Sequence, residues 1–342
     1  MEISLGEKSK RVRWVDIAKG LLMIIVVISH MDEATNVDDT VAHVLNGFES
    51  IYNSFFMGAF FVITGLCTNF YKPWKEYMKG SFKSLIIPGF FLLLLARCIC
   101  VYPLMFFHHN LIGILGSIQG LVFDTLLYGA AAWFLAAMFV SRILCKVLLQ
   151  IVNNTTFQFL IVVSVGLLGL YVKNSGIACF DYWRLSYAMI FVPYLWGGGH
   201  FMKRFDVDKY LGIYPAIISV VILCACLMYD STIKMTLSVN CSFTQIPLLI
   251  IESLSGIYIV LSISYLLKEN RFLEHIGKIS LIVYLVQWSV MSTFISHSHL
   301  FGHNMALSIF GYFSTVALVL LFATVIHKIC VSSKYLKFVI GK

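Results

Sequence analysis

Charged residues are scarce in this chain. Of its 342 residues only 12% are Asp, Glu, Lys or Arg, whereas 59% are hydrophobic and the mean hydropathy is +0.87. A soluble globular domain usually carries about 25% charged and about 45–50% apolar residues. The composition therefore excludes an ordinary soluble domain and indicates that lipid is the solvent of most of the chain.

The net charge of +8 does not indicate a nucleic-acid partner. Binding to nucleic acid needs a basic face on a folded soluble domain. Here the lysines and arginines stand in short clusters between apolar runs, which is the pattern of loops between membrane helices. We therefore expect membrane lipid, and no nucleic acid, around this protein.

Several common motifs are also missing. The nine cysteines form no CxxC pair and no zinc-ligand spacing, so we interpret them as small core residues. No A-x-A-like cleavage site follows Ser29 and His30, so the first apolar run is expected to remain as a membrane helix. Without an internal repeat, a low-complexity tract or a long linker, residues 1–342 are expected to form a single helical membrane domain.

Long apolar runs dominate what is present. A helix that crosses a bilayer needs about 20 largely apolar residues. Such runs lie near residues 14–31, 50–71, 85–107, 132–151, 156–173, 186–202, 210–229, 244–267, 279–297 and 305–327. The sequence therefore predicts an all-α integral membrane protein with about ten transmembrane helices.

The distribution of cations predicts the topology. With ten spans and both termini in the cytoplasm, twenty lysines and arginines fall on the inside and three on the outside, as the positive-inside rule requires. A further span in the weaker apolar run 111–130 would invert every later loop. We therefore expect 111–130 to be extracytoplasmic, either interfacial or re-entrant.

Ionisable side chains within the apolar runs are functional candidates, because each costs roughly 2.5–3.5 kcal/mol at the bilayer centre. Asp16, Lys19 and His30 share the first run. Lys19 and His30 are about three helical turns apart, ~16 Å along the axis, and project from one helix face. Asp16 and Lys19 also suit a simple ion pair near the cytoplasmic interface.

Arg97 and Glu252 lie within later spans. Arg97 is expected to face the bundle interior and to pair with an anion, either Glu252 or Asp16. A structural ion pair and a substrate-binding cation both suit Arg97. Buried charges of this kind could equally line the path of a secondary transporter, although the internal repeat of many transporters is missing here.

The first apolar run also carries a recognisable pattern. An arginine and a W-x-D-like element open it, and a basic residue stands ten intervening positions before a histidine; the residues are Arg13, Trp14, Asp16, Lys19 and His30. This pattern resembles the membrane acyltransferase 3 family, which includes bacterial glycan O-acetyltransferases. The run IYNSFFMGAFFVITGL is similar to the family's F-x-M-P-x-F-F-x-x-S-G stretch, but Phe56 and Gly58 replace its frequent histidine and its proline.

The resemblance continues in order along the chain. KGSFKSLIIP, from Lys79 to Pro88, resembles a basic R-x-x-R-like segment with lysines instead of arginines. AAWFLAAMF, around Trp133, is similar to a W-F-L element. HIGKISLIVYLVQW, from His275, resembles G-x-x-S-x-x-I-Y-x-x-H, with Gln287 in place of the final histidine.

The resemblance implies an O-acyltransferase of the bacterial inner membrane. Its donor would be cytoplasmic acyl-CoA, with acetyl as the first expectation, and its acceptor a hydroxyl of an extracytoplasmic glycan or lipid-linked sugar. The resemblance implies that His30 is the catalytic group. Histidine chemistry allows either a general base or a covalent acyl carrier. We expect no permanently bound cofactor and no metal.

Other residues are candidates for binding or support. Lys79 and Lys83 could bind the phosphates of the donor, although plain positive-inside topology also explains them. The candidates for substrate or acyl-CoA binding are Lys19, Lys79, Lys83 and Arg97, and the supporting candidates are Asp16, Glu49, Glu252 and Trp133. Glu49 would orient His30, unless it is only a solvated loop charge.

Overall fold

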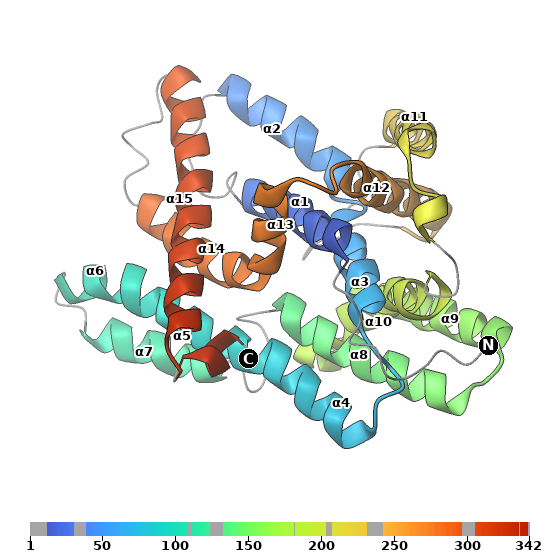
Figure 1. The fold of residues 1–342 in the computed structure, drawn as a ribbon, viewed down its shortest axis with the longest axis horizontal. Coiled ribbons are helices and arrows are strands. Elements are labelled where there is room, and N and C mark those ends of the chain that lie inside the picture. The colour runs from blue at the N-terminus through green and yellow to red at the C-terminus, as the bar shows by residue number, and fades with distance from the viewer. Residues whose placement is uncertain are drawn as a thin grey trace.

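The computed structural model describes most of the chain. The described residues are 12–30, 39–107, 111–123, 133–180, 182–202, 207–230, 242–295, 305–334 and 336–340. Within them the protein is helical and contains no strand (Figure 1). The all-α class is thus confirmed for the described residues.

Helices follow one another with short connections. The α-helices are α1 (Arg13–Ser29), α2 (Asp39–Tyr52), α3 (Phe56–Cys67), α4 (Trp74–Ser81), α5 (Ile87–Cys100), α6 (Tyr102–Phe107), α7 (Leu111–Phe123), α8 (Trp133–Ile151), α9 (Thr155–Asn174), α10 (Leu185–Trp196), α11 (Ile213–Tyr229), α12 (Ile246–Leu266), α13 (Arg271–Lys278), α14 (Ser280–Ile295) and α15 (Met305–Ser332). Two π-helical turns, η1 (Phe82–Ile86) and η6 (Gly197–Phe201), join or extend them. Short 3₁₀ turns are η4 (Ala178–Phe180), η5 (Tyr182–Arg184), η8 (Val207–Lys209), η9 (Phe243–Gln245) and η11 (Lys337–Ile340).

Several helices are long and apolar enough to cross a membrane. Among the described residues these are Trp74–Cys100, Trp133–Ile151, Thr155–Asn174, Ile246–Leu266 and Met305–Ser332. Shorter apolar helices occur at Phe56–Cys67, Leu111–Val122, Ile213–Tyr229 and Ser280–Met291. These helices fit a multi-pass membrane protein. The count of ten spans stays a prediction, and so does the cytoplasmic placement of the termini, because residues 1–11 and 341–342 lie outside the described residues.

Three expected apolar runs differ from the helices that the structure contains. The run 85–107 is divided, because α5 ends at Cys100 and α6 begins at Tyr102. The run 50–71 is divided, because α2 ends at Tyr52 and α3 begins at Phe56. In the run 111–130, α7 has 13 residues. At 1.5 Å per residue it is about 20 Å long, shorter than a bilayer core of about 30 Å. Residues 124–130 are outside the described residues, so an interfacial or re-entrant placement stays a prediction.

The first helix occupies the centre of the molecule. In Figure 1, α1 lies between α15, α14 and α5 on one side and α8, α9 and α10 on the other. It contacts α3, α12, α13, α14 and α15, while α7 packs only against its neighbours α5 and α6 among the principal contacts. Any chemistry carried by α1 is therefore enclosed by the bundle.

The short helix α13 packs closely on the start of α1. The side chain of Asn270 caps α13 by accepting a hydrogen bond from the Leu273 backbone N–H, 3.0 Å away. A Cβ added to Gly277 would lie 1.7 Å from the Asp16 carbonyl oxygen, and one added to Gly20 would lie 2.2 Å from that of Leu273. Glycine at both positions allows the two backbones to touch.

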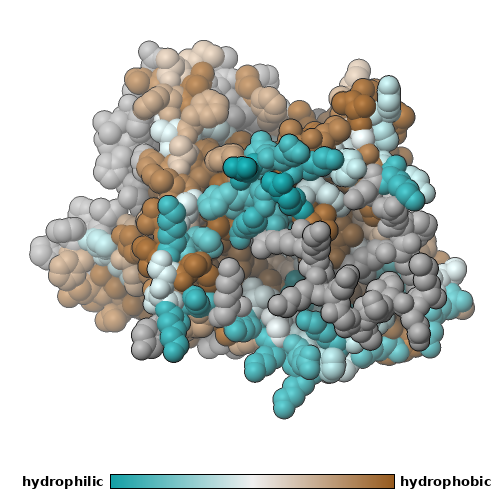
Figure 2. Space-filling view, in the orientation of Figure 1, coloured by the Kyte–Doolittle hydropathy of each residue, from teal (hydrophilic) through white to brown (hydrophobic). Residues whose placement is uncertain are grey.

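Hydrophilic side chains gather on one face of the molecule. Figure 2 shows them in the centre, over the region of α1 and α13, and again along the lower edge near α4, with hydrophobic surface on both flanks. The exposed charged residues of these helices include Arg13 on α1, Lys278 on α13, and Lys75 and Lys79 on α4. The positive-inside rule makes this face the expected cytoplasmic one.

Candidate functional site

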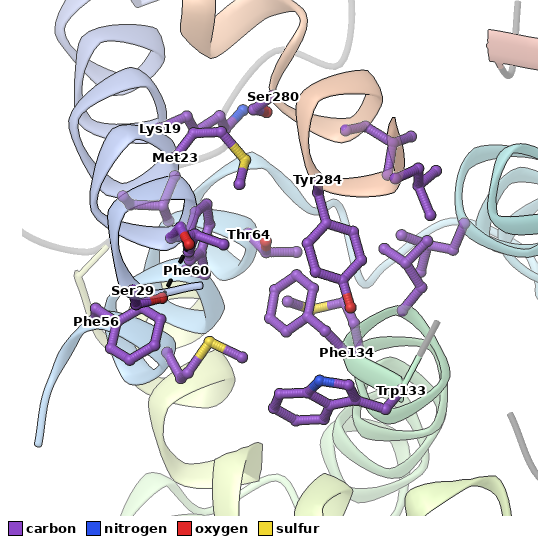
Figure 3. Close-up of a pocket in the computed structure, with 18 of the residues that line it drawn as sticks. Lys19, Met23, Ser29, Phe56, Phe60, Thr64, Trp133, Phe134, Ser280 and Tyr284 are labelled. Carbon is purple, nitrogen blue, oxygen red and sulfur yellow. Dashed lines mark hydrogen bonds between the residues drawn. The ribbon is translucent and has the colours of Figure 1, made fainter. Parts of the chain in front are cut away.

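A cavity of about 750 Å³ lies inside the bundle. Its wall is formed mainly by α1, α3, α8 and α14 (Figure 3). The end of α2, the junction of α13 and α14, η1 and α5 complete it. The helices come from distant parts of the sequence. The cavity is thus a product of tertiary packing and not of one local motif.

One face of α1 runs along the whole cavity. Lys19, Met23, Val26 and His30 line it, each three or four residues after the previous one. This spacing brings side chains to one stripe of a helix. Lys19 and His30 therefore face the same space from positions about 16 Å apart along the axis, as the helical period predicts.

Lysine and arginine side chains collect around one part of the cavity, which we call the cationic end and define by Lys19, Arg142 and Lys278. Lys19 Nζ lies 3.9 Å from Asp16 Oδ1 and 3.5 Å from Cys67 Sγ. Arg142 lines the same cavity, and its Nη1 lies 3.5 Å from Ser84 Oγ.

Lys278, the third cation of this end, is paired with a carboxylate that does not line the cavity. Lys278 forms a close ion pair with Glu274, whose carboxylate is also 3.0 Å from Arg13 Nη2. Hydrogen bonds from Lys278 and then Arg13 hold the pKa of Glu274 below its ordinary value, because they stabilise the ionised carboxylate. The start of α1 and α13 are thereby joined by charge as well as by backbone contact.

The opposite end contains the candidate catalytic group. This histidine end is defined by His30, Glu49, Asn53 and Trp288, which all line the cavity. His30 is the C-terminal cap residue of α1 and is half-buried. Its ring centre lies 5.1 Å from that of Trp288, and Asn53 Nδ2 donates a 2.8 Å hydrogen bond to Glu49 Oε1.

Aromatic side chains separate the two ends. The ring centres of Phe60 and Phe134 are 5.6 Å apart, as are those of Phe134 and Tyr284. Figure 3 shows Trp133, Phe134 and Tyr284 on one side of the space and Met23 and Phe60 on the other. The middle of the cavity is therefore mostly apolar and suits an uncharged, elongated group.

The structure brings only part of the predicted site together. Lys19, His30, Glu49 and Trp133 line the cavity. Asp16 is 2% exposed and reaches the site through Lys19. Lys79 and Lys83 are exposed on α4 and η1 and do not line the cavity.

Arg97 and Glu252 lie elsewhere in the bundle. Arg97 Nη1 donates to the carbonyl oxygen and to Oγ of Ser117, both at 3.3 Å, and so joins α5 to α7. Glu252 is fully buried in α12. In the described part of the chain neither Glu252 nor Asp16 forms an ion pair with Arg97. The described hydrogen-bond partners of the Arg97 guanidinium are therefore the neutral carbonyl and hydroxyl of Ser117, and not a carboxylate.

Sequence reasoning missed several polar lining residues: Ser29, Asn53, Thr64, Arg142, Lys278, Ser280 and Tyr284. Arg142 and Lys278 counted only as topology-setting cations. A signal for Arg142 does exist in the sequence, because Leu135, Met138 and Arg142 follow one another at three and four residues on the helix that begins with Trp133. All three line the cavity.

Several ionisable residues of the sequence lie outside the described residues. They are Asp32, Glu33, Asp38, Asp124 and the histidines His108, His109, His297, His299 and His303. Within the part of the chain that the structure describes, no group of three or more His, Cys, Asp or Glu residues is placed to hold a metal ion.

Comparison with known proteins identifies the family. No curated protein and no solved structure matches the chain. A family model described as an acyltransferase domain matches residues 12–328, nearly the whole chain and every helix that lines the cavity. The protein therefore belongs to the acyltransferase 3 family, and the cavity between Lys19 and His30 lies within its acyltransferase domain.

Proposed function

We propose that the protein transfers an acyl group, acetyl in the first instance, from cytoplasmic acyl-CoA to a hydroxyl of an extracytoplasmic glycan or lipid-linked sugar in the bacterial inner membrane. The observation that carries this proposal is one cavity with cations at one end and His30 at the other. Arg97 and Glu252, which would line the path of a transporter, lie outside that cavity.

The cavity suits an acyl-CoA donor that enters at the cationic end. Its phosphates need cations, which Lys19, Arg142 and Lys278 supply. Its pantetheine arm is uncharged and elongated, and the aromatic middle of the cavity has matching character. The thioester would then reach the histidine end, about 16 Å further along α1.

His30 supplies the base that the reaction needs. A sugar hydroxyl is a weak nucleophile near neutral pH, so a base must remove its proton as the oxygen attacks the thioester carbonyl. The new C–O bond forms as the C–S bond breaks, and the proton passes from His30 to the departing CoA thiolate. Glu49, held by Asn53 in the same end of the cavity, is the candidate for orienting the imidazole.

A covalent route uses the same residues. Here an imidazole nitrogen of His30 attacks the thioester, CoA leaves as the thiol, and the sugar oxygen then takes the acyl group from the histidine. Both routes require His30 and an acceptor at the histidine end. They differ in whether an acyl-enzyme forms before the acceptor arrives.

Replacing His30 tests the proposal. Radiolabelled acetyl-CoA is supplied to the cytoplasmic face of membrane vesicles, and transfer of label into a panel of glycans is compared for wild type and His30→Ala. Loss of the base is expected to lower transfer by about 10²–10⁴-fold. Normal transfer by correctly inserted His30→Ala would refute the proposal.

A histidine outside the cavity provides the matched control. His327 lies on α15 with its ring 6.4 Å from that of His275, and it does not line the cavity. His327→Ala is expected to insert normally and to transfer label at the wild-type rate. Parallel loss of activity in both variants would point to damaged folding instead of lost catalysis.

A further inference from the structure

Arg142 is a partly satisfied cation on the wall of the cavity. Its Nη1 lies 3.5 Å from Ser84 Oγ, at the limit of a hydrogen bond, and its backbone carbonyl accepts a 3.0 Å hydrogen bond from the Tyr77 hydroxyl. Its Nε is buried and has no hydrogen-bond partner among the residues that the structure describes. A buried charged donor without a partner carries a desolvation cost.

The two lysines of the cationic end differ from Arg142 in one respect. Lys19 has Asp16 as a carboxylate partner, and Lys278 has Glu274. Within the described residues Arg142 has no carboxylate at ion-pair distance, and its electrostatic interactions are with Tyr77 and Cys67. A half-buried guanidinium in a membrane domain favours a bound anion, and the cavity beside it has room for one.

The helix opposite Arg142 is shaped around this position. The π-helical turn η1 interrupts the helix between α4 and α5 and contains both Ser84, which faces Arg142, and Leu85, which lines the cavity. Turns of this type occur frequently at functional sites. The lysines of the same segment, Lys79 and Lys83, are exposed and outside the cavity.

We propose that Arg142 is the principal binding group for the diphosphate of the acyl-CoA donor, with Lys19 and Lys278 as flanking charges. The planar guanidinium can hold two phosphate oxygens at once, which the lysines cannot do. The inference rests on the proposed function, since that function supplies the donor. It replaces Lys79 and Lys83 as the phosphate-binding residues.

Ligand binding tests Arg142 without any acyl transfer. Purified protein in nanodiscs of phosphatidylcholine is titrated with CoA and with pantetheine, which has the same thiol arm but no nucleotide and no diphosphate. Arg142→Gln is expected to weaken CoA binding at least about tenfold, because a charged hydrogen-bonded contact is lost. Pantetheine binding should not change. In transfer assays the KM for acetyl-CoA should rise while kcat changes little.

Two further variants keep the result interpretable. Arg271→Gln removes an exposed arginine of α13 outside the cavity and should bind CoA as the wild type does. Arg142→Lys keeps the charge and should bind with intermediate affinity, and it remains informative if Arg142→Gln fails to fold. Loss of CoA binding in the double variant Lys79→Gln, Lys83→Gln, with Arg142→Gln unaffected, would overturn the inference.

The phosphate could also come from a lipid headgroup. If Arg142 binds lipid, CoA affinity in phosphatidylcholine nanodiscs will be equal for wild type and Arg142→Gln, and adding phosphatidylglycerol will alter only the wild type. That result overturns the inference and leaves the transfer reaction intact. Conversely, Arg142-dependent CoA binding without transfer to any acceptor would sustain the inference and refute the proposed function.

Discussion

The two ends of the cavity differ in the residues that form them and in how those residues are held in place. At the cationic end, α1 and α13 touch through Gly20 and Gly277, and ion pairs to Asp16 and Glu274 fix the charges of Lys19 and Lys278. At the histidine end, His30 stands at the last turn of α1 against the ring of Trp288. We infer that the first end holds the donor and the second performs the chemistry.

This difference gives each end its own kinetic signature. A group that binds the donor equally in the ground state and the transition state changes KM, while a group used only in the transition state changes kcat. Variants at Arg142 should therefore act on KM and variants at His30 on kcat. If variants at Arg142 and at His30 changed KM and kcat to the same extent, the two ends would not have separate roles in binding and chemistry.

The largest structural effect is expected at the contact of α1 with α13. In Gly277→Ala the new methyl group would meet the Asp16 carbonyl, which is backbone and has no rotamer by which to move away. Forcing the helices apart should cost about 3 kcal/mol or more, and Lys278 and Lys19 would separate. The variant should show a lower unfolding temperature in detergent and weaker CoA binding.

A second glycine serves as the control. Gly80 lies in α4, and a Cβ added there would have no atom within 4 Å. Gly80→Ala should therefore leave the unfolding temperature unchanged or raise it slightly, since alanine is the better helix former. Wild-type stability in Gly277→Ala would show that the cationic end tolerates separation of its helices.

The sequence predicts the geometry of α1 because that geometry is local. The helical period alone places Lys19 and His30 on one face of α1, and in the structure both side chains line the same cavity. The acyltransferase family is likewise confirmed, since its pattern is carried by residues in order along the chain. Both predictions use only the spacing of residues within the sequence.

The rest of the site depends on contacts between distant segments. Arg142 and Tyr284 enter the cavity because α8 and α14 pack around it. Helical spacing places Arg142 on the same face of α8 as Leu135 and Met138, but it does not show which helices that face packs against. Phosphate binding by Lys79 and Lys83 stays a prediction, although neither lysine lines the cavity. Topology and phosphate binding both place cations at the cytoplasmic side, so a basic cluster by itself does not distinguish them.

We expect residues of the histidine end, and not those of the cationic end, to determine which acyl group the enzyme accepts. The ring of Trp288 stands against His30, where it would limit the space beyond the thioester carbonyl. In Trp288→Ala we expect the use of butyryl-CoA relative to acetyl-CoA to rise about tenfold, because a methylene group in a pocket is worth about 1–3 kcal/mol. Competition between the two labelled donors measures this ratio.

Trp288→Phe is the matched variant for this experiment. It keeps an aromatic wall beside His30 and should retain the preference for acetyl-CoA. Arg142→Gln, at the other end, should lower the use of both donors equally, because they share the same diphosphate. An unchanged ratio in Trp288→Ala would mean that another part of the cavity limits acyl length.

The smallest expected effect concerns the ion pairs that join α1 to α13. Hydrogen bonds from Lys278 and Arg13 lower the pKa of Glu274 in the folded protein. In the unfolded chain that pKa lies near 4.3. Glu274 therefore stabilises the fold above about pH 4.3, and this contribution disappears as the pH falls through the lower folded pKa.

Thermal unfolding at two pH values checks this dependence. Glu274→Gln should unfold at a slightly lower temperature than wild type at pH 7, and the difference should shrink below about pH 4 as the carboxylate of the wild type is protonated. Glu269→Gln, which removes an exposed charge just before α13, should show no such dependence. If the difference in unfolding temperature between wild type and Glu274→Gln persists unchanged at acid pH, Glu274 joins the helices by packing and not by charge. The contacts of Gly20 and Gly277 would then be what holds α1 and α13 together at the cationic end.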